Sequence, residues 1–262
     1  MRHYIKVYIF IIFQYMKIKL EYRFDFFVSS IGLILTSLSG IFTFLILFES
    51  IPSLAGWSFF ELLFIYSFSM LASVPMQVMF DNIWSLGDHL ERGTFIKYYF
   101  KPLNMMFYYM SEVFDIKGIS QFLLALSLLI YTSIQLDLKW GFLELLLFIF
   151  NLFGASLIII SLMIIAGSTA FWFTHSRAAL QFTFKLKDFS RYPISIFGKA
   201  FRFVFICIIP TSFISFFPSI LFIRPSEASI ISYMAPIVGI IMFYGSYLIW
   251  NKGVNTYTGT GS

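Results

Sequence analysis

Six long stretches of this chain contain no Asp, Glu, Lys or Arg, and they constrain its fold more than any other feature. They cover residues 26–48, 62–80, 118–136, 145–176, 203–223 and 228–251. A helix that crosses the hydrocarbon of a bilayer needs about 20 mostly apolar residues, and a charge at its centre costs roughly 2.5–3.5 kcal/mol. The stretches therefore predict six transmembrane helices. Because they are apolar throughout, they do not fit the alternating strands of a β-barrel.

The composition excludes a soluble globular enzyme. Hydrophobic residues make up 59% of the chain and charged residues 12%, whereas soluble domains average about 45–50% and about 25%. A disordered chain is excluded as well, because it needs low hydrophobicity and high charge. The single cysteine, Cys207, excludes a disulfide framework and a cysteine metal cluster.

The charges and prolines predict the boundaries within a single transmembrane domain over residues 1–262. The fourth stretch is longer than a span requires, so we expect it to extend into the cytoplasm or to break near Gly167–Ser168. Pro210 and Pro218 interrupt the fifth stretch, which should end early and lead into a short re-entrant or interfacial segment. The expected spans lie near residues 26–48, 62–80, 118–136, 145–173, 201–217 and 230–250.

Residues 3–22 form a separate element before the first span. Their large aliphatic residues fall on one stripe of a helix, and their tyrosines suit the headgroup region. No small-residue cleavage site follows, which disfavours a signal peptide. We expect an amphipathic helix at the cytoplasmic interface and prefer it to a frayed start of the first span.

The distribution of basic residues predicts the orientation. With a cytoplasmic N-terminus, 16 of the 18 Lys and Arg residues fall in cytoplasmic segments, and only Lys139 and Arg224 fall outside. By the positive-inside rule, both termini and the connections 81–117 and 177–202 are then cytoplasmic. The net charge of +5 is explained by this topology, so the lipid bilayer is an expected partner and nucleic acid is not.

Several kinds of chemistry have no signature in the sequence. There is no phosphate-binding loop of the G-x-x-x-x-G-K-[ST] type, no H-E-x-x-H and no G-x-S-x-G. The expected spans also lack the charged residue that ion-coupled transporters place in a cavity, although sodium sites built from carbonyls and hydroxyls stay possible. We therefore expect no catalytic residue, metal or cofactor in this chain, and any energy source should lie on another polypeptide.

Two spans carry stripes of small and hydroxyl side chains. Such residues either let membrane helices pack closely or line a mildly polar cavity that would suit an amphipathic or lipid-like cargo. The candidate lining residues are Thr36, Ser39 and Thr43 in the first span and Tyr66, Ser69, Ser73 and Gln77 in the second.

The connection 81–104 alternates charged, aromatic and glycine residues. Gly93 can end a short helix, and Pro102 can start a new element. A short amphipathic helix presented to the cytoplasm between two spans would be a docking element. The alternative is an ordinary interfacial loop.

Three segments carry a family resemblance. They read L-E-R-G-T-F-I-K-Y-Y-F-K-P-L at 90–103, R-Y-P-I-S-I-F-G-K-A-F-R at 191–202 with I-I-P-T-S-F-I-S-F-F-P at 208–218, and G-V-N-T-Y-T-G-T-G at 253–261. In this order they resemble the integral-membrane permeases of ABC type-2 exporters, the six-span kind without a fused ATPase domain.

The resemblance implies an all-α polytopic membrane protein of the ABC type-2 exporter fold, with an N-terminal interfacial helix. It implies a second permease, identical or homologous, and separate ABC ATPase subunits that bind ATP and Mg. It also implies that the loop 81–104 transmits ATPase motion to the spans. The residues that it assigns to the ATPase contact are Glu91, Arg92, Gly93, Thr94, Phe95 and Lys97. Those near an outer gate are Phe213, Phe216 and Phe217.

The function expected from these features is export of an amphipathic or lipid-like cargo across a bacterial cytoplasmic membrane. An autonomous channel or facilitator is the alternative, since the hydroxyl stripes occur without buried charges. A lipid-modifying enzyme is disfavoured because no His, Asp or Glu constellation falls at membrane depth.

Overall fold

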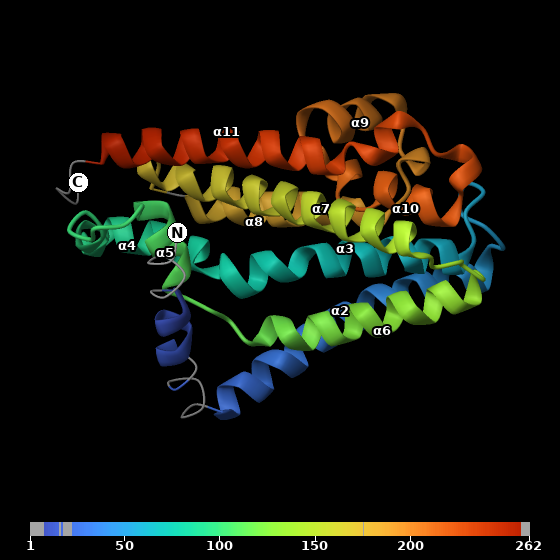
Figure 1. Ribbon diagram of the computed structural model, residues 1–262, viewed down its shortest axis with the longest axis horizontal. Helices are drawn as coiled ribbons and strands as arrows, with labels where there is room; N and C mark the ends of the chain where they lie inside the picture. The colour runs from blue at the N-terminus through green and yellow to red at the C-terminus, as the bar shows by residue number, and fades with distance from the viewer. Residues whose placement is uncertain (1–7, 16, 18–22, 175, 258–262) are drawn as a thin grey trace.

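The computed structural model describes residues 8–15, 17, 23–174 and 176–257, and the long helices among them run along one axis of the molecule (Figure 1). These helices are α2 (Arg23–Ser50), α3 (Phe59–Met79), α6 (Lys117–Gln135), α7 (Phe142–Ser168), α8 (Ser176–Lys187) and α11 (Ala235–Thr256). Shorter helices are α4 (Leu86–Glu91), α5 (Met105–Ser111), α9 (Lys199–Phe203) and α10 (Phe216–Ile223). The described residues contain no sheet, only an isolated bridge between Leu54 and Trp57.

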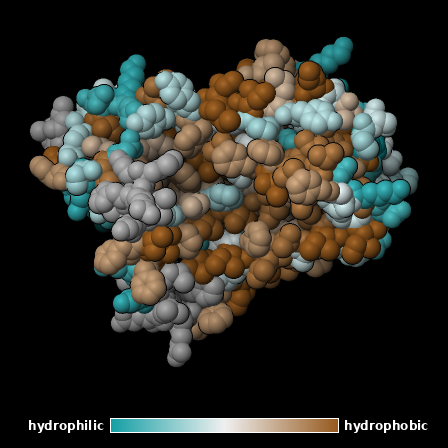
Figure 2. Space-filling view, in the orientation of Figure 1, coloured by the Kyte–Doolittle hydropathy of each residue, from teal (hydrophilic) through white to brown (hydrophobic). Residues whose placement is uncertain are grey.

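Five of the described helices are long and apolar enough to cross a membrane, and a bent pair of apolar segments, 199–208 and 211–223, has the composition of either a broken span or a re-entrant loop. Figure 2 shows apolar residues over most of the middle of one face and hydrophilic residues gathered mainly toward the two ends of the long axis. This distribution suits a bilayer whose normal is parallel to the long axis, and the chain is an all-α multi-pass membrane protein.

The start of α2 and the end of α11 lie at the same end of the molecule as α4 and α5 (Figure 1). We call this the loop end, because it holds the connection 81–104, and we call the other the far end. Residues 8–15 are helical and lie across the bundle axis at the loop end. The ring of Tyr8 packs 6.1 Å from that of Phe107 in α5. Most other residues of the interfacial helix expected over 3–22 lie outside the described ones.

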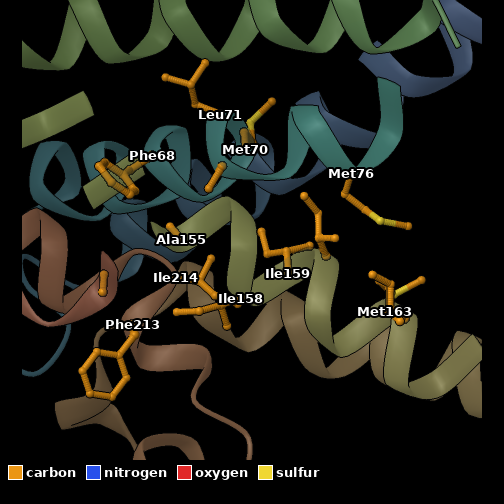
Figure 3. Packing of buried hydrophobic residues seen from close by; sticks show 14 of the residues in the cluster. Phe68, Met70, Leu71, Met76, Ala155, Ile158, Ile159, Met163, Phe213 and Ile214 are labelled. Atoms are coloured by element: carbon orange, nitrogen blue, oxygen red, sulfur yellow. The ribbon is translucent and has the colours of Figure 1, made fainter. Parts of the chain in front are cut away.

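Helix α3 forms the centre of the bundle and packs against α2, α6 and α7. Figure 3 labels Phe68, Met70 and Leu71 of α3 and Ala155 and Ile158 of α7, and shows Leu71 pointing away from α7. All five side chains are buried. Because of this central position, α3 has no lipid-facing stripe over most of its length, and its small hydroxyl residues are buried together with its apolar ones.

Helices α7 and α11 cross at two glycines. A Cβ atom on Gly154 would lie 2.4 Å from the backbone nitrogen of Pro236, and one on Gly239 would lie 2.4 Å from the carbonyl oxygen of Gly154. Both distances are too short for any side chain, so these glycines allow the backbones to touch. Close approach through small residues is a common way for membrane helices to associate.

Several helices begin or end at residues that the charge-free stretches do not predict, because local sequence signals determine these ends. Helix α3 begins at Phe59, ahead of the expected 62, because Ser58 and Glu61 form a capping box in which the Ser58 amide donates to Glu61 Oε2 at 2.8 Å. Helix α7 ends at Ser168, at the expected break. Helix α11 begins at Ala235 rather than 230, and its Pro236 sits in the first turn, where a missing amide hydrogen is tolerated.

The sequence predicts that residues 177–202 form a cytoplasmic connection, and the structure shows that this prediction is wrong. Helix α8 packs along α7, and its first residue, Ser176, lies at the loop end with its Oγ 2.8 Å from the position of a Cβ on Gly87. At the other extreme, Ser195 Oγ accepts a hydrogen bond of 2.9 Å from the indole of Trp57 at the far end. The chain therefore crosses the bundle between residues 176 and 195.

The prediction of a fifth span at 201–217 is also wrong, because these residues belong to two segments that turn back on each other. Helix α9 continues into a π-helical turn, η6 (Val204–Ile208), and the segments 199–208 and 211–223 meet at an angle of 72°. The turn after Pro210 brings Ser215 to the carbonyl of Ser190, while Arg224 returns to Glu61 at the far end. The pair thus forms a re-entrant hairpin on the far side. The proline break falls where the sequence predicts it, but the crossing itself lies upstream.

Candidate functional site

The connection 81–104 folds into a compact unit at the loop end. A 3-10 turn, η1 (Asp81–Ser85), leads into α4, and a second turn, η2 (Thr94–Tyr98), follows Gly93. Gly93 has a φ of +68° and donates its amide to the carbonyl of Leu90 at 3.1 Å. Left-handed backbone at a helix C-terminus favours glycine because it carries no Cβ. A short helix is therefore present where the sequence predicts one, and Gly93 ends it, while its docking role stays a prediction.

The residues predicted to contact an ATPase divide into two groups. Glu91, Arg92, Thr94 and Lys97 are exposed, and Gly93 is partly exposed. Phe95 has 0% of its surface exposed, so it cannot contact a partner chain directly, and its assignment to the contact surface is corrected here. The role of the exposed residues stays a prediction.

Phe95 is the centre of what we call the Phe95 cluster. Its ring lies within 5.3–6.3 Å, centroid to centroid, of six other rings. They belong to Tyr98, Tyr99, Tyr109, Phe171, Trp250 and Tyr257. Edge-to-face and tilted aromatic pairs add about 0.5–1.5 kcal/mol each beyond burial. The cluster joins η2 to α5, to the turn after α7 and to the end of α11.

Hydrogen bonds reinforce this junction. Tyr109 donates its hydroxyl to the carbonyl of Asn82 at 2.9 Å, and the Asn82 amide donates to the carbonyl of Tyr109 at 2.7 Å. Tyr99 donates to the carbonyl of Val254 in α11 at 2.7 Å. A displacement of the loop therefore cannot occur without moving α5 and the end of α11.

Burial dominates the electrostatics of the loop end. It raises the pKa of Tyr109, and the nearby Tyr98 adds to this effect. Burial also raises the pKa of Tyr98, which donates a hydrogen bond to Glu112. The pKa of His89 is lowered, first by burial and then by the charge of Lys97. The ring of His89 is held by Thr94, whose Oγ1 lies 2.8 Å from His89 Nδ1.

Sequence reasoning missed two apolar side chains on the loop. Ile96 is 45% exposed and Phe100 is 80% exposed. The signal lies in the run F-I-K-Y-Y-F, where Phe95 and Tyr98 are buried and the residues between and after them are not. Exposed apolar residues rimmed by charges are typical of protein contact sites, and these two lie next to Lys97 and Lys101 in the chain.

The two hydroxyl stripes have different surroundings. Thr36, Ser39 and Thr43 are exposed, and each hydroxyl donates to a carbonyl of its own helix at 2.7–2.8 Å. The α3 stripe is largely buried. Tyr66 donates to the carbonyl of Ser37 at 2.7 Å, and Ser69 Oγ lies 2.8 Å from Ser190 Oγ. This stripe packs against the 176–195 crossing.

Two cavities found among the described residues are not lined by these side chains. One, of about 340 Å³, lies between Tyr8, α3, α5 and α11, and the other, of about 500 Å³, lies between α6 and α7. Gln77 is partly buried, and its Oε1 has no hydrogen-bond partner among the described residues. The proposed cavity lining therefore stays a prediction for this chain by itself.

The three phenylalanines predicted near an outer gate are buried at the far end. The rings of Phe213 and Phe217 lie 4.9 Å apart, and that of Phe216 packs on Trp57 at 5.7 Å. Arg224 lies 3.9 Å above the Trp57 ring, and its Nε donates to Glu61 Oε1 at 2.6 Å. Aromatic side chains and the ion pairs of Arg224 with Glu61 and Glu227 therefore pack together at the far end. Whether it opens as a gate stays a prediction.

No curated protein and no solved structure matches this chain significantly. A family model described as "ABC-2 family transporter protein" matches residues 33–261, which is nearly the whole chain. The match covers the helical bundle, the loop 81–104 and the Phe95 cluster. The chain therefore belongs to the ABC-2 family of transporter proteins, as a multi-pass membrane permease.

Proposed function

We propose that this chain is the membrane-spanning permease subunit of an ATP-driven exporter whose ATPase is a separate polypeptide. The observation that carries the proposal is the construction of the loop end. An exposed helix and turn sit on the buried Phe95 cluster, which reaches the ends of α7 and α11. Since the sequence has no phosphate-binding loop, ATP and Mg would be bound by the partner.

Coupling then works through packing. An ATPase pressing on the exposed loop residues, among them Glu91 and Arg92, would displace η2 with them. Phe95 would carry that displacement to Phe171 and Trp250, because densely packed rings shift together. The ends of α7 and α11 would move as a pair, joined at their Gly154–Gly239 crossing.

The proposal extends to the assembly. A second permease, identical or homologous, completes the translocation path. One copy does not form this path alone, because the polar stripe of α3 is buried inside the bundle. The exposed hydroxyls of Thr36, Ser39 and Thr43 would then face that path. The cargo is amphipathic or lipid-like, and the membrane is a bacterial cytoplasmic membrane with both termini on the cytoplasmic side.

The direct test is purification of the tagged protein from its native membrane in mild detergent, with partners identified by mass spectrometry. We expect a nucleotide-binding ATPase in stoichiometric amount, together with a second permease copy or a homologue. A known exporter complex carried through the same detergent controls for dissociation. Recovery of this chain alone, together with flux through it in liposomes without nucleotide, would replace the proposal with a channel or facilitator.

A further inference from the structure

The 176–195 crossing places three charged side chains at the middle of the bundle. Lys187 ends α8, and Asp188 and Arg191 belong to the 3-10 turn η4 (Asp188–Arg191) that follows. Ser190, which lies in the same turn as Asp188 and Arg191, contacts Ser69. Ser69 is the midpoint of α3, with ten residues of the helix on either side of it. Charges at such depth are expensive, and they mark ligand or ion pathways in membrane proteins.

The Lys187 ammonium is buried and poorly bonded. Only 5% of the residue is exposed, yet its Nζ lies 3.4 Å from Ser73 Oγ and 3.7 Å from Asp188 Oδ1. Hydrogen bonds from N–H to oxygen are usually about 2.7–3.2 Å long. Apart from the Phe184 ring at 4.6 Å, the described residues offer this ammonium no other partner. A group with three donors is left without a close acceptor.

Arg191 has donors to spare as well. Its Nη2 lies 2.8 Å from Asp188 Oδ1, and its guanidinium faces the Tyr66 ring at 5.2 Å. Its side chain is 27% exposed, and no other acceptor within the described ranges binds it. A guanidinium presents five N–H donors in a planar fork that matches phosphate and carboxylate groups. Two cations share one carboxylate here, which leaves one positive charge without a counterion.

The backbone is irregular at the same place. Helix α8 ends at Lys187, η4 follows, and Tyr192 and Pro193 are extended. Non-helical backbone at membrane depth is tolerated where it is buried in protein or lines a cavity. Transporters place substrate sites near the midplane at such discontinuous helices. Position, charge and backbone therefore point to the same site.

We infer that Lys187 and Arg191 bind the phosphate or carboxylate group of an amphiphile, with the hydroxyls of Ser69 and Ser73 beside it. The rings of Phe184 and Tyr66 flank the cations and suit the adjoining apolar part. This inference rests on the proposed function and narrows it, because it makes the exported cargo an anionic amphiphile. A cationic or neutral cargo would leave the extra positive charge unpaired.

The test uses the full-length protein, purified in dodecyl maltoside, and dodecyl phosphate as the probe. Native mass spectrometry measures the bound fraction against probe concentration. Lys187→Gln and Arg191→Gln should each weaken binding by about tenfold or more, because a charged hydrogen bond is lost. Lys185→Gln is the matched control, since Lys185 is exposed two residues earlier and should change affinity less than about twofold.

Inorganic phosphate distinguishes the two sources of the anion. It should compete only at concentrations about 100-fold higher or more, because it lacks the apolar chain whose burial adds affinity. Equal competition by inorganic phosphate would overturn the assignment to an amphiphile. Absence of saturable binding, or equal affinity in all variants, would overturn the site itself.

Two further measurements keep the result interpretable. Arg191→Lys retains the charge and should retain part of the affinity, which a folding defect would not. Gel filtration of each variant reports whether it is intact, and Lys187→Met, which also removes the charge, replaces Lys187→Gln if the latter aggregates. Since no ATPase is present, failure here would leave the exporter proposal standing with another cargo, whereas failure to recover an ATPase would leave the anion site standing.

Discussion

The ring of Phe95 touches six other aromatic rings, whereas the ammonium of Lys187 has no hydrogen-bond partner nearer than 3.4 Å in the described structure. Both side chains are buried. One region contains uncharged rings that pack together from several elements, although the Trp250 indole nitrogen and the Tyr257 hydroxyl have no hydrogen-bond partner among the described residues. The other contains charged groups that share a single carboxylate.

The comparison shows that buried side chains can have two different roles, transmission of a displacement and recognition of a ligand. A densely packed cluster resists deformation, so it is suited to transmit a displacement between elements. An under-bonded charge is destabilising until a ligand arrives, so it is suited to recognition. If this contrast is correct, substitutions in the two regions should change stability in opposite directions.

The largest expected effect is at Phe95. Phe95→Ala should lower the free energy of unfolding by about 3–5 kcal/mol, since it removes a large buried side chain and leaves a cavity between six rings. Thermal unfolding in detergent measures it. Phe100→Ala is the control, because Phe100 is 80% exposed and its change should stay within about 0.5 kcal/mol. Equal effects of the two substitutions would contradict the central role of the cluster.

The next effect concerns coupling. Glu91→Ala combined with Arg92→Ala should leave folding intact, because both side chains are exposed, but should reduce ATP-driven transport by about tenfold or more. Transport and ATP hydrolysis are measured together in proteoliposomes that contain the whole complex. The control pair is Glu49→Ala with Lys139→Ala, both exposed at the far end. Full transport by the Glu91 and Arg92 double variant would remove the docking assignment.

The sequence predicted the helices that begin and end near charges, and it failed where charges lie inside the bundle. Spans near 26–48, 118–136 and 145–173 are close to α2, α6 and α7 because nothing charged interrupts them. The 176–195 crossing was missed because a charge count treats Lys187 and Arg191 as solvated. In the fold, Asp188 and the α3 hydroxyls surround them instead.

The position of the candidate loop site could be predicted from the sequence, but which of its side chains are exposed could not. The glycine and the alternation of charges and rings located it, yet only the packing of distant residues decides which rings are buried. Phe171 and Trp250, far along the chain, turn Phe95 inward. The pairing of Glu61 with Arg224 is likewise invisible in a charge list, although Glu61 also belongs to the capping box at the start of α3.

A change of opposite sign is expected at Lys187. Lys187→Met should raise the free energy of unfolding by about 1–4 kcal/mol, because a buried and poorly paired charge is replaced by an apolar side chain of similar length. Asp188 keeps Arg191 at 2.8 Å, so no carboxylate is stranded. Unfolding without added anion measures the effect, with Lys185→Met as the control. A loss of stability comparable with that of Phe95→Ala would show that Lys187 is a structural residue.

The smallest effect is a pH dependence at the loop end, where the pKa of His89 is lowered by burial first and by Lys97 second. A histidine whose pKa is lower in the folded state binds fewer protons than it does unfolded, so stability falls as the pH drops below its ordinary value of about 6.5. The midpoint of thermal unfolding should therefore decrease between about pH 7 and about pH 5, and His89→Gln should make that decrease shallower. Asp88 and Glu112 oppose the shift, so the change is modest. If His89→Gln leaves the slope as it is, the acid sensitivity of this end comes from carboxylates, and the Phe95 cluster is insensitive to the charge beside it.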